Sequence, residues 1–269
     1  MADPIKLYYY RHRDGTPNFG DALSPMIIER VIGRRTVWAR QTDCDMAAIG
    51  SILSGILQRS WKRWLSLRFS PVHIWGSGFI RAPEAAELAA KGALHVHAVR
   101  GHATRAGLKM PETTALGDPG LLAGRLLRKP VKKRHSWAIV PHTVDAGMAV
   151  IRGLKACTPH AAIADLNGDP DACLETIAAS DFVISTSLHG LITADALGIP
   201  SIWAKMSGRV SGDRFKFEDY YSALGMTAPD RFKIQRPLNL DMLCERAICA
   251  PSAAVEARAD ALVAAFPAL

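Results

Sequence analysis

Residues 181–200 read DFVISTSLHGLITADALGIP, and this stretch predicts the unit from which the fold is built. The apolar run 182–184 is typical of a buried strand, and it meets three hydroxyl residues at 185–187 that can cap a following helix. We expect that helix to begin at His189 and another strand to follow at 201–203. A strand, a helix and a strand in this order are the pattern of a βαβ unit with parallel strands.

The same alternation extends along the chain in both directions. Further strands are predicted at Ile5–Tyr10, Thr36–Ala39, Ala47–Ile49, Val72–Trp75, His95–Val99, Thr114–Leu116, Trp137–Val140 and Ala161–Leu166. Further helices are predicted from Asp169, Asp213 and Ser252. The sequence therefore predicts an α/β fold of the doubly wound kind, with parallel strands covered by helices on both faces.

A basic segment interrupts this alternation. Residues 125–135, RLLRKPVKKRH, carry six Lys or Arg and a proline, and the next strand begins after them. We expect a boundary here, with an N-terminal lobe at 1–128, a C-terminal lobe at 129–250 and a C-terminal helix at 251–269 that crosses back to the first lobe. A run of like charges is usually a solvated linker, and steering of anions is the alternative interpretation.

Composition narrows the function classes. The 269 residues are 49% hydrophobic and 22% charged, which excludes extensive disorder, and no stretch of 18 apolar residues occurs. The five cysteines are scattered without a C-x-x-C pair, which argues against a disulfide framework and a zinc site. We therefore expect a soluble protein of a reducing, cytoplasmic compartment. The net charge of +8 favours an anionic partner, whether nucleic acid, a membrane surface or a phosphorylated substrate.

Glycine-rich segments follow the predicted strands. In open α/β sheets, ligands bind beyond the carboxyl ends of the strands, where the backbone can approach them closely. These segments are Asn18–Asp21, Gly50–Ser51, Gly76–Gly78, Arg100–Gly101, Gly117–Gly120 and Ser185–Gly190. Their repetition predicts one cleft lined by backbone amides, although each glycine taken alone is an ordinary turn. None of them matches a Walker A loop or a complete dinucleotide fingerprint.

Two side chains at these strand ends suit an anionic ligand. His189 falls in the first turn of its helix, where free N–H groups and the helix dipole favour phosphate, and its imidazole can exchange a proton near neutral pH. Arg100 ends a strand, and its planar guanidinium suits a carboxylate or a phosphate. A histidine packed between strand and helix and an arginine in a salt bridge are the alternative interpretations.

Taken together, these segments resemble a known family, the polysaccharide pyruvyl transferases, and in particular the shorter ketal-pyruvyl transferases of exopolysaccharide synthesis such as those for xanthan and succinoglycan. The segments that carry the resemblance span most of the chain: Asn18–Asp21 with Leu23–Ser24, Gly50–Leu53, Trp75–Gly78, Val99–Gly101 with Thr104–Arg105, Gly117–Leu122, Ile139–His142, Ser185–Gly190 with Gly198–Pro200, and Asp213–Lys216 with Asp219–Tyr221. The resemblance implies two Rossmann-like lobes facing a cleft, like those of GT-B glycosyltransferases. It also implies phosphoenolpyruvate as donor, a sugar acceptor commonly carried on a lipid, and no metal or other cofactor.

The resemblance assigns roles to residues. His189 and Arg100 match the family's key positions and are expected to be catalytic. The expected donor-binding residues are Arg100, Ser187, Leu188, His189, Gly190, Arg214 and Lys216. The expected acceptor or cleft-lining residues are Asn18, Gly20, Asp21, Gly50, Ser51, Gly76, Ser77, Gly78, Asp118 and His142. Two sugar hydroxyls would form a ketal with the pyruvyl group while phosphate leaves. His189 would act as a general acid or base, or would assist the departure of the phosphate. Asp21 or Asp118 would orient the hydroxyls, and helix capping or turn formation is the alternative for both acids.

Residues 54–70 are longer than the corresponding stretch of the xanthan-type enzymes. Apolar residues recur at helical spacing among basic ones, which is the composition of an interfacial helix and suggests peripheral membrane contact. The residues concerned are Leu53, Leu57, Arg59, Trp61, Lys62, Arg63, Trp64, Leu65 and Phe69. A surface helix packed on its own sheet is the alternative.

Two other functions compete with pyruvyl transfer. A glycosyltransferase with a nucleotide-sugar donor would share the fold and the cleft, so only donor chemistry separates the two. A basic nucleic-acid-binding module is the other, but the sequence contains no RNA-recognition, zinc-finger or clear helix-turn-helix pattern. We therefore expect no nucleic-acid partner.

Overall fold

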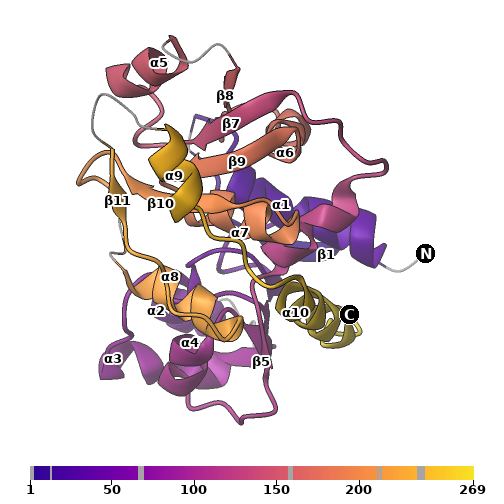
Figure 1. Cartoon of the computed structure of the whole chain (residues 1–269). Coiled ribbons are helices and arrows are strands. Elements are labelled where there is room, and N and C mark those ends of the chain that lie inside the picture. Colours follow the sequence, from indigo (N-terminus) through magenta and orange to yellow (C-terminus); the bar gives the residue numbers. More distant parts are fainter. Residues whose placement is uncertain are drawn as a thin grey trace.

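The computed structural model of the chain describes residues 3–12, 14–65, 70–156, 160–210, 212, 214–234 and 240–269. Within these ranges the chain forms two parallel β-sheets with interleaved helices, an α/β arrangement of two Rossmann-like lobes (Figure 1). The fold class expected from the sequence is therefore confirmed. The predicted helix start at Asp213 lies outside the described residues, and the helix is defined from Phe215.

The first sheet has six parallel strands in the order β2-β1-β3-β4-β5-β6. Its strands are β1 (Ile5–Tyr8), β2 (Thr36–Trp38), β3 (Met46–Ala47), β4 (Val72–Trp75), β5 (Leu94–Val99) and β6 (Ala115–Leu116). The helical elements of this half are α1 (Phe19–Ile27), the π-helix η1 (Ile28–Ile32), α2 (Leu53–Leu65), α3 (Ala85–Leu88), the 3-10 helices η2 (Lys91–Ala93) and η3 (Pro119–Leu126), and α4 (His102–Gly107).

The second sheet has five parallel strands in the order β11-β10-β9-β7-β8. Its strands are β7 (His135–Val140), β8 (Ala161–Ile163), β9 (Ser180–Ser185), β10 (Ser201–Lys205) and β11 (Phe232–Lys233). The helices of this half are α5 (Ala149–Ala156), α6 (Pro170–Ala178), α7 (Leu188–Ala196), α8 (Phe215–Ala223), α9 (Leu240–Arg246) and α10 (Ser252–Ala264). All ten predicted strands are present, and among the strands of the described residues only the two-residue edge strand β11 was not predicted.

Helix α1 joins the two lobes at their shared core. The N–H of Phe19 donates to the carbonyl of Leu166 in the second lobe at 2.8 Å, and the apolar face of the helix packs against η3, α6 and α7. One cluster of buried side chains combines Leu7 and Trp75 of the first lobe with Val140 and Val183 of the second. Because apolar burial is the main stabilising term, the lobes share one core at this contact.

Two later helices return to the first lobe. Helix α8 packs beside α4, and α10 lies against β6 and η3 (Figure 1). The indole Nε1 of Trp75 donates to the carbonyl of Leu262 in α10 at 2.8 Å, which ties the C-terminal helix to β4. Residues from both ends of the chain therefore build the first lobe.

Helix α2 packs on its own sheet through Leu53, Ile56 and Leu57, which are buried in the core with Ile74. The side chains of Trp61, Arg63, Trp64, Leu65 and Phe69 lie outside the described part of the chain, so the membrane hypothesis stays a prediction. In the part that the structure describes, no helix combines the length and the apolar character needed to cross a lipid bilayer.

Candidate active site

A cavity of about 240 Å³ lies between the two lobes at the carboxyl ends of their strands. This volume is below the roughly 300–1,000 Å³ typical of sites for drug-sized ligands, so the cavity suits a smaller metabolite. Nine residues predicted from the sequence line it: Asn18, Asp21, Gly50, Ser51, His142, Ser187, Leu188, His189 and Lys216. Five lining residues were not predicted: Tyr10, Ile52, Ile80, Thr143 and Leu166.

His189 stands in the first turn of α7, directly after the turn that ends β9. The Ser185 hydroxyl accepts from the N–H of Ser187 at 3.0 Å and lies 3.0 Å from the carbonyl oxygen of Val140, which fixes this turn. Ser187 occupies the N-cap position without a side-chain capping bond. Ser187, Leu188 and His189 line the cavity, and the first N–H groups of α7 have no capping side chain; uncapped N–H groups at a helix start favour an anion.

Gly20 sets the position of the His189 ring. A Cβ at Gly20 would lie 2.0 Å from His189 Nδ1, so only glycine lets the first turn of α1 approach the imidazole so closely. Asn18 caps α1 by accepting from the N–H of Gly20 at 3.1 Å. The Asn18–Asp21 segment thus supports the histidine from the opposite lobe.

The cationic groups of the cavity depress one another's pKa. Burial, then the charges of Lys216, Arg100 and His142, lower the pKa of His189 to about 3. Burial and the charge of Arg100 lower the pKa of Lys216 to about 8. Near neutral pH the cavity therefore holds a neutral imidazole beside an ammonium group, and an anionic ligand would stabilise the protonated form of either.

His142 approaches from the end of β7. Its backbone N–H donates to Thr186 Oγ1 at 2.8 Å, and its Nδ1 accepts from the N–H of Val144 at 3.3 Å. Burial, followed by the charge of Lys216, lowers the pKa of His142 to about 4. A neutral ring that accepts at Nδ1 carries its proton on Nε2.

Asp21 is the acidic group of the cavity. It lies in the first turn of α1 and is only 7% exposed. Burial raises the pKa of its carboxyl to about 7, against the lowering effect of a hydrogen bond from the Tyr10 backbone. A carboxyl that titrates near neutral pH can give and take protons, as general acid–base catalysis requires.

Arg100 does not line the cavity, contrary to the expectation that its guanidinium faces the ligand. The side chain is fully buried at the end of β5, where Nε pairs with Asp219 Oδ2 of α8 at 3.0 Å. Its remaining nitrogens donate to Ser51 Oγ at 2.6 Å and to the carbonyl of Phe79. Arg100 therefore stands behind Ser51, one residue away from the cavity wall, and the salt-bridge alternative describes its contacts.

Seven other predicted residues also lie outside the cavity wall, and one of them is Gly20, which packs on His189. Gly78 packs on the guanidinium of Arg100, since a Cβ there would lie 2.4 Å from its Cζ. Ser77 donates to the carbonyl of Ala48, and Gly76 has a φ of +82° beside Pro119. The structure places them around the ion pair and in the strand-end turns, away from the ligand space.

Asp118 caps η3, since it accepts from the N–H of Gly120 at 2.9 Å, and burial raises its pKa to about 6. Gly190 packs against Ser185 Oγ. Arg214 pairs with Glu218 at 3.0 Å on the surface of α8. The contacts of Asp118 are thus those of a helix cap, the alternative interpretation. Of the two predicted basic residues Arg214 and Lys216, it is Lys216 that lines the cavity.

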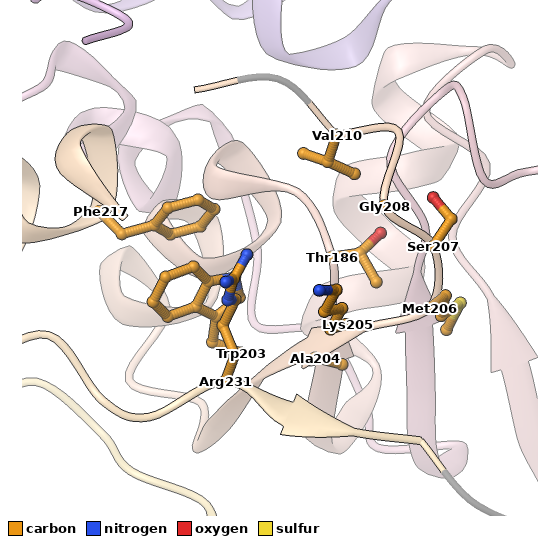
Figure 2. Close-up of a pocket in the computed structure, with 10 residues that line it drawn as sticks. All are labelled: Thr186, Trp203, Ala204, Lys205, Met206, Ser207, Gly208, Val210, Phe217 and Arg231. Carbon is orange, nitrogen blue, oxygen red and sulfur yellow. The ribbon is translucent and has the colours of Figure 1, made fainter. Parts of the chain in front are cut away.

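A second cavity of about 250 Å³ is lined by Thr186, which follows β9, and by nine other residues (Figure 2). The ends of β9 and β10, the loop at 206–210 and Arg231 line it, with the rings of Trp203 and Phe217 stacked at a centroid distance of 3.9 Å. Its basic groups are Lys205 and Arg231.

A more open groove of about 430 Å³ runs from the first cavity over the first lobe. Tyr10 borders both spaces and is 48% exposed. The groove combines aromatic and basic side chains: Tyr8, Tyr10, Trp38, Arg11, Arg40, Arg59 and Lys62. The polar residues Gln41 and Thr42 also line the groove.

A model of the family described as "Polysaccharide pyruvyl transferase" matches residues 3–205 of the chain. The chain belongs to this family. The match covers both sheets up to β10 and includes Asp21 and His189 of the cavity, whereas Lys216 follows the matched segment. The resemblance expected from the strand-end motifs is therefore confirmed.

Two relatives extend this comparison. The succinoglycan biosynthesis protein ExoV of Rhizobium meliloti (strain 1021) is 25% identical over 228 residues, which are 83% of this chain and 66% of that protein. The uncharacterized protein L143 of Acanthamoeba polyphaga mimivirus is 30% identical over 145 residues, 51% of this chain and 50% of that protein. The chain thus spans between half and two thirds of the length of these relatives. No solved structure matches it closely enough to count as similar.

The lining of the cavity between the lobes could be predicted in large part because its residues stand at strand ends. The missed lining residues have a weaker signal. Tyr10 and Leu166 end predicted strands and Ile80 follows Gly76–Gly78, so their positions pointed to the cleft, but their side chains carry no distinctive chemistry.

Proposed function

We propose that this chain transfers a pyruvyl group from phosphoenolpyruvate to two hydroxyls of a sugar, in the biosynthesis of an exopolysaccharide. The observation that carries the proposal is that Asp21, His189 and Lys216 line one metabolite-sized cavity between the lobes. Family membership supports pyruvyl transfer as the reaction. The name of the succinoglycan relative supports the biological setting.

The donor would bind through its two anionic groups. The phosphate carries about −1.5 to −2 charge and suits the N–H groups at the start of α7, with Lys216 as counter-ion. Arg100 adds positive charge from behind Ser51 without touching the ligand, since it already acts on His189 and Lys216 through space. No metal or other cofactor is part of this proposal.

The chemistry needs one proton at carbon and one at phosphate. The methylene carbon of phosphoenolpyruvate gains a proton, and the central carbon becomes cation-like and takes up a sugar oxygen. Phosphate then leaves with its electron pair, and a second sugar oxygen closes the ketal. The two hydroxyls release two protons, of which one replaces that used at carbon and one leaves with phosphate, so the reaction balances.

Asp21 is the proposed proton donor to carbon, because burial holds its pKa near 7 and about half of its carboxyls are protonated at neutral pH. It then recovers a proton from a sugar hydroxyl. His189, neutral near pH 7, takes the proton of the other sugar hydroxyl, because the donor's negative charges raise its proton affinity, and transfers that proton to the leaving phosphate.

The acceptor would lie in the groove that begins at Tyr10. The exposed rings of Tyr10 and Trp38 offer apolar faces for a sugar, and Arg11, Arg40 and Arg59 suit an anionic carrier such as the diphosphate of a lipid-linked oligosaccharide. This places the acceptor on the first lobe, beside α2.

The test is incubation of the protein with phosphoenolpyruvate and candidate oligosaccharides, lipid-linked and free, followed by mass spectrometry and phosphate assay. We expect a pyruvate-ketal mass gain on the acceptor with equimolar phosphate, and a loss of about 10²-fold or more in rate in folded His189→Ala. Wild-type turnover by that variant would overturn the assignment of His189.

One observation favours a second candidate, a glycosyltransferase with a nucleotide-sugar donor. The cavity with Lys205 and Arg231 lies at the strand ends of the C-terminal lobe and could hold a diphosphate (Figure 2). Release of a nucleoside diphosphate, with no phosphate from phosphoenolpyruvate, would favour this candidate over pyruvyl transfer.

A further inference from the structure

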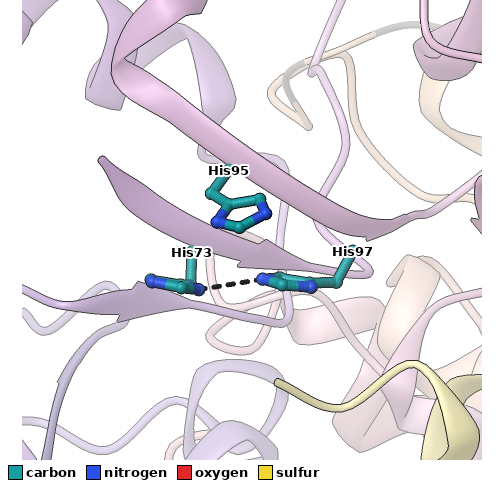
Figure 3. A group of neighbouring side chains, drawn as sticks. All are labelled: His73, His95 and His97. Carbon is teal, nitrogen blue, oxygen red and sulfur yellow. Dashed lines mark hydrogen bonds between the residues drawn. The ribbon is translucent and has the colours of Figure 1, made fainter. Parts of the chain in front are cut away.

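Three imidazoles meet on one face of the first sheet, away from both cavities described above. His73 of β4 pairs in register with His95 of β5, and His97 follows two residues later on the same strand (Figure 3). His73 Nδ1 and His97 Nε2 are 2.8 Å apart, and one ring nitrogen from each of the three residues lies within 4.8 Å of the others.

His97 lies on the same face of β5 as His95, because alternate side chains of a strand point to the same face, and an irregularity of the strand pairing leaves no residue of β4 opposite it. Ile74 of β4 pairs with Val96 of β5, but the next residue, Trp75, pairs with Ala98. The register between the two strands therefore shifts by one residue at this point. His97 is therefore the extra residue of a β-bulge. Bulges in parallel strands are rare, and bulges in general re-aim a side chain at a local site. Without the shift, His97 would stand opposite Trp75.

Solvent can reach the three rings, and the neutral form is favoured for His73 and His97. His95 is exposed, whereas His73 and His97 are half-buried. Burial and the two neighbouring rings lower the pKa of His97 to about 4, and burial with His95 lowers the pKa of His73 against the raising effect of Asp45. Neutral imidazole is the form that coordinates metal ions.

We propose that His73, His95 and His97 bind one divalent transition-metal ion of the Zn²⁺ type, with water in the remaining position. The site is separate from pyruvyl transfer, since its side chains line neither the donor cavity nor the acceptor groove. Its expected effect is to clamp β4 to β5. The cysteine pattern argued against zinc, but imidazoles from two strands form a site that cysteine spacing does not reveal.

The geometry fits after small movements. Tetrahedral Zn²⁺ with bonds of about 2.0–2.1 Å holds its nitrogen ligands about 3.3 Å apart. The close pair must therefore open by about 0.5 Å and the widest pair close by about 1.5 Å, which the exposed ring of His95 allows by rotation. Imidazole ligands suit Zn²⁺, Cu²⁺ and Ni²⁺ better than Mg²⁺ or Ca²⁺.

The test uses the full chain after removal of metals by a chelator. Zn²⁺ is titrated by calorimetry and Co²⁺ by visible absorption into the wild type, His95→Ala, His97→Ala and the control His160→Ala, an exposed histidine elsewhere on the surface. We expect one equivalent bound by the wild type and by the control. Affinity should fall about ten-fold or more in the two site variants.

Two further readouts distinguish binding at the three histidines from binding at thiols or at scattered surface groups. Excess Zn²⁺ should raise the melting temperature of the wild type but not of His95→Ala, because a ligand that binds only the folded state stabilises it. The Co²⁺ spectrum should lack a thiolate charge-transfer band, which the exposed thiols of Cys244 and Cys249 would produce if they bound the ion. Absence of saturable binding, unchanged affinity in His95→Ala, or a thiolate band would overturn the proposal.

Discussion

At the scale of single residues, Gly20 packs directly on His189, which lines the cavity proposed to bind the donor. Gly20→Ala would place a methyl group 2.0 Å from His189 Nδ1, so the imidazole must move. Because a displacement of about 1 Å can cost about 10²-fold in rate, we expect a loss of that order in kcat/KM with an intact fold. Circular dichroism and initial rates with phosphoenolpyruvate measure the two effects.

Gly147→Ala is the matched control, since a Cβ at Gly147 meets no atom within 4 Å. It should keep wild-type activity. If Gly20→Ala were equally active, the fixed position of His189 could not matter for the reaction.

The buried carboxyl of Asp21 predicts a pH dependence of stability. Its pKa is raised from 3.8 to about 7, so between these values the folded protein binds more protons than the unfolded chain. The contribution of Asp21 to the free energy of unfolding therefore falls as pH rises from about 4 to about 7, and this contribution does not change further above that range. The upper limit of the loss is on the order of 4 kcal/mol.

Asp21→Asn removes this titration. Urea unfolding at about pH 5 and about pH 8 should show the variant gaining stability relative to wild type at the higher pH, with activity lost at both. A difference in unfolding free energy that does not depend on pH would contradict the raised pKa.

Site residues could be predicted from the sequence where they depend on neighbours close in the chain, and could not where their partner is distant in the chain. His189 and Asp21 could be placed because each follows a predicted strand within its own βα unit. The partner of Arg100 in its ion pair could not be predicted, because Asp219 lies 119 residues further along the chain, on a helix that returns to the first lobe.

At the scale of elements, Arg100 ties β5 to α8. Asp219 also accepts from the N–H and the hydroxyl of Thr104 at 2.8 and 2.7 Å, so α4 joins the same network. Removing one partner of a buried pair leaves the other charge uncompensated. Arg100→Ala is thus expected to cost about 3–5 kcal/mol in unfolding free energy, measured by urea denaturation.

Arg125→Ala provides the comparison, because the side chains of Arg125 and its partner Asp260 are 42% and 73% exposed, and loss of this surface pair should cost about 0–1 kcal/mol. Arg100→Lys keeps the charge and serves if Arg100→Ala does not fold. Wild-type stability of Arg100→Ala, together with weakened phosphoenolpyruvate binding, would instead place the guanidinium at the ligand.

Elements were predictable where local pattern decides them. The strand predicted at Val72–Trp75 has the bounds that the structure shows, and helix α10 begins at Ser252, as predicted. The bulge at His97 and the short strand β11 could not be predicted. Both depend on which strand lies alongside, and a single sequence gives little information about how strands pair.

At the scale of the whole molecule, the lobes meet through α1 and one shared core, and the cavity lies where their strand ends face each other. The parallel α/β architecture followed from the alternation of strands and helices. The return of α8 and α10 to the first lobe brings Lys216 and the Arg100 pair into place, and it depends on tertiary packing that periodicity does not encode.

The central claim is that phosphoenolpyruvate binds in the cavity of His189 and Lys216. Calorimetric titration of phosphoenolpyruvate into wild type, Lys216→Met and Lys205→Met tests it most directly, since Lys205 lines the other cavity. We predict that Lys216→Met weakens binding about ten-fold or more, the loss of about 1.4 kcal/mol or more from a buried counter-ion, while Lys205→Met binds like wild type. Undiminished binding by Lys216→Met, with binding lost in Lys205→Met, would contradict the account.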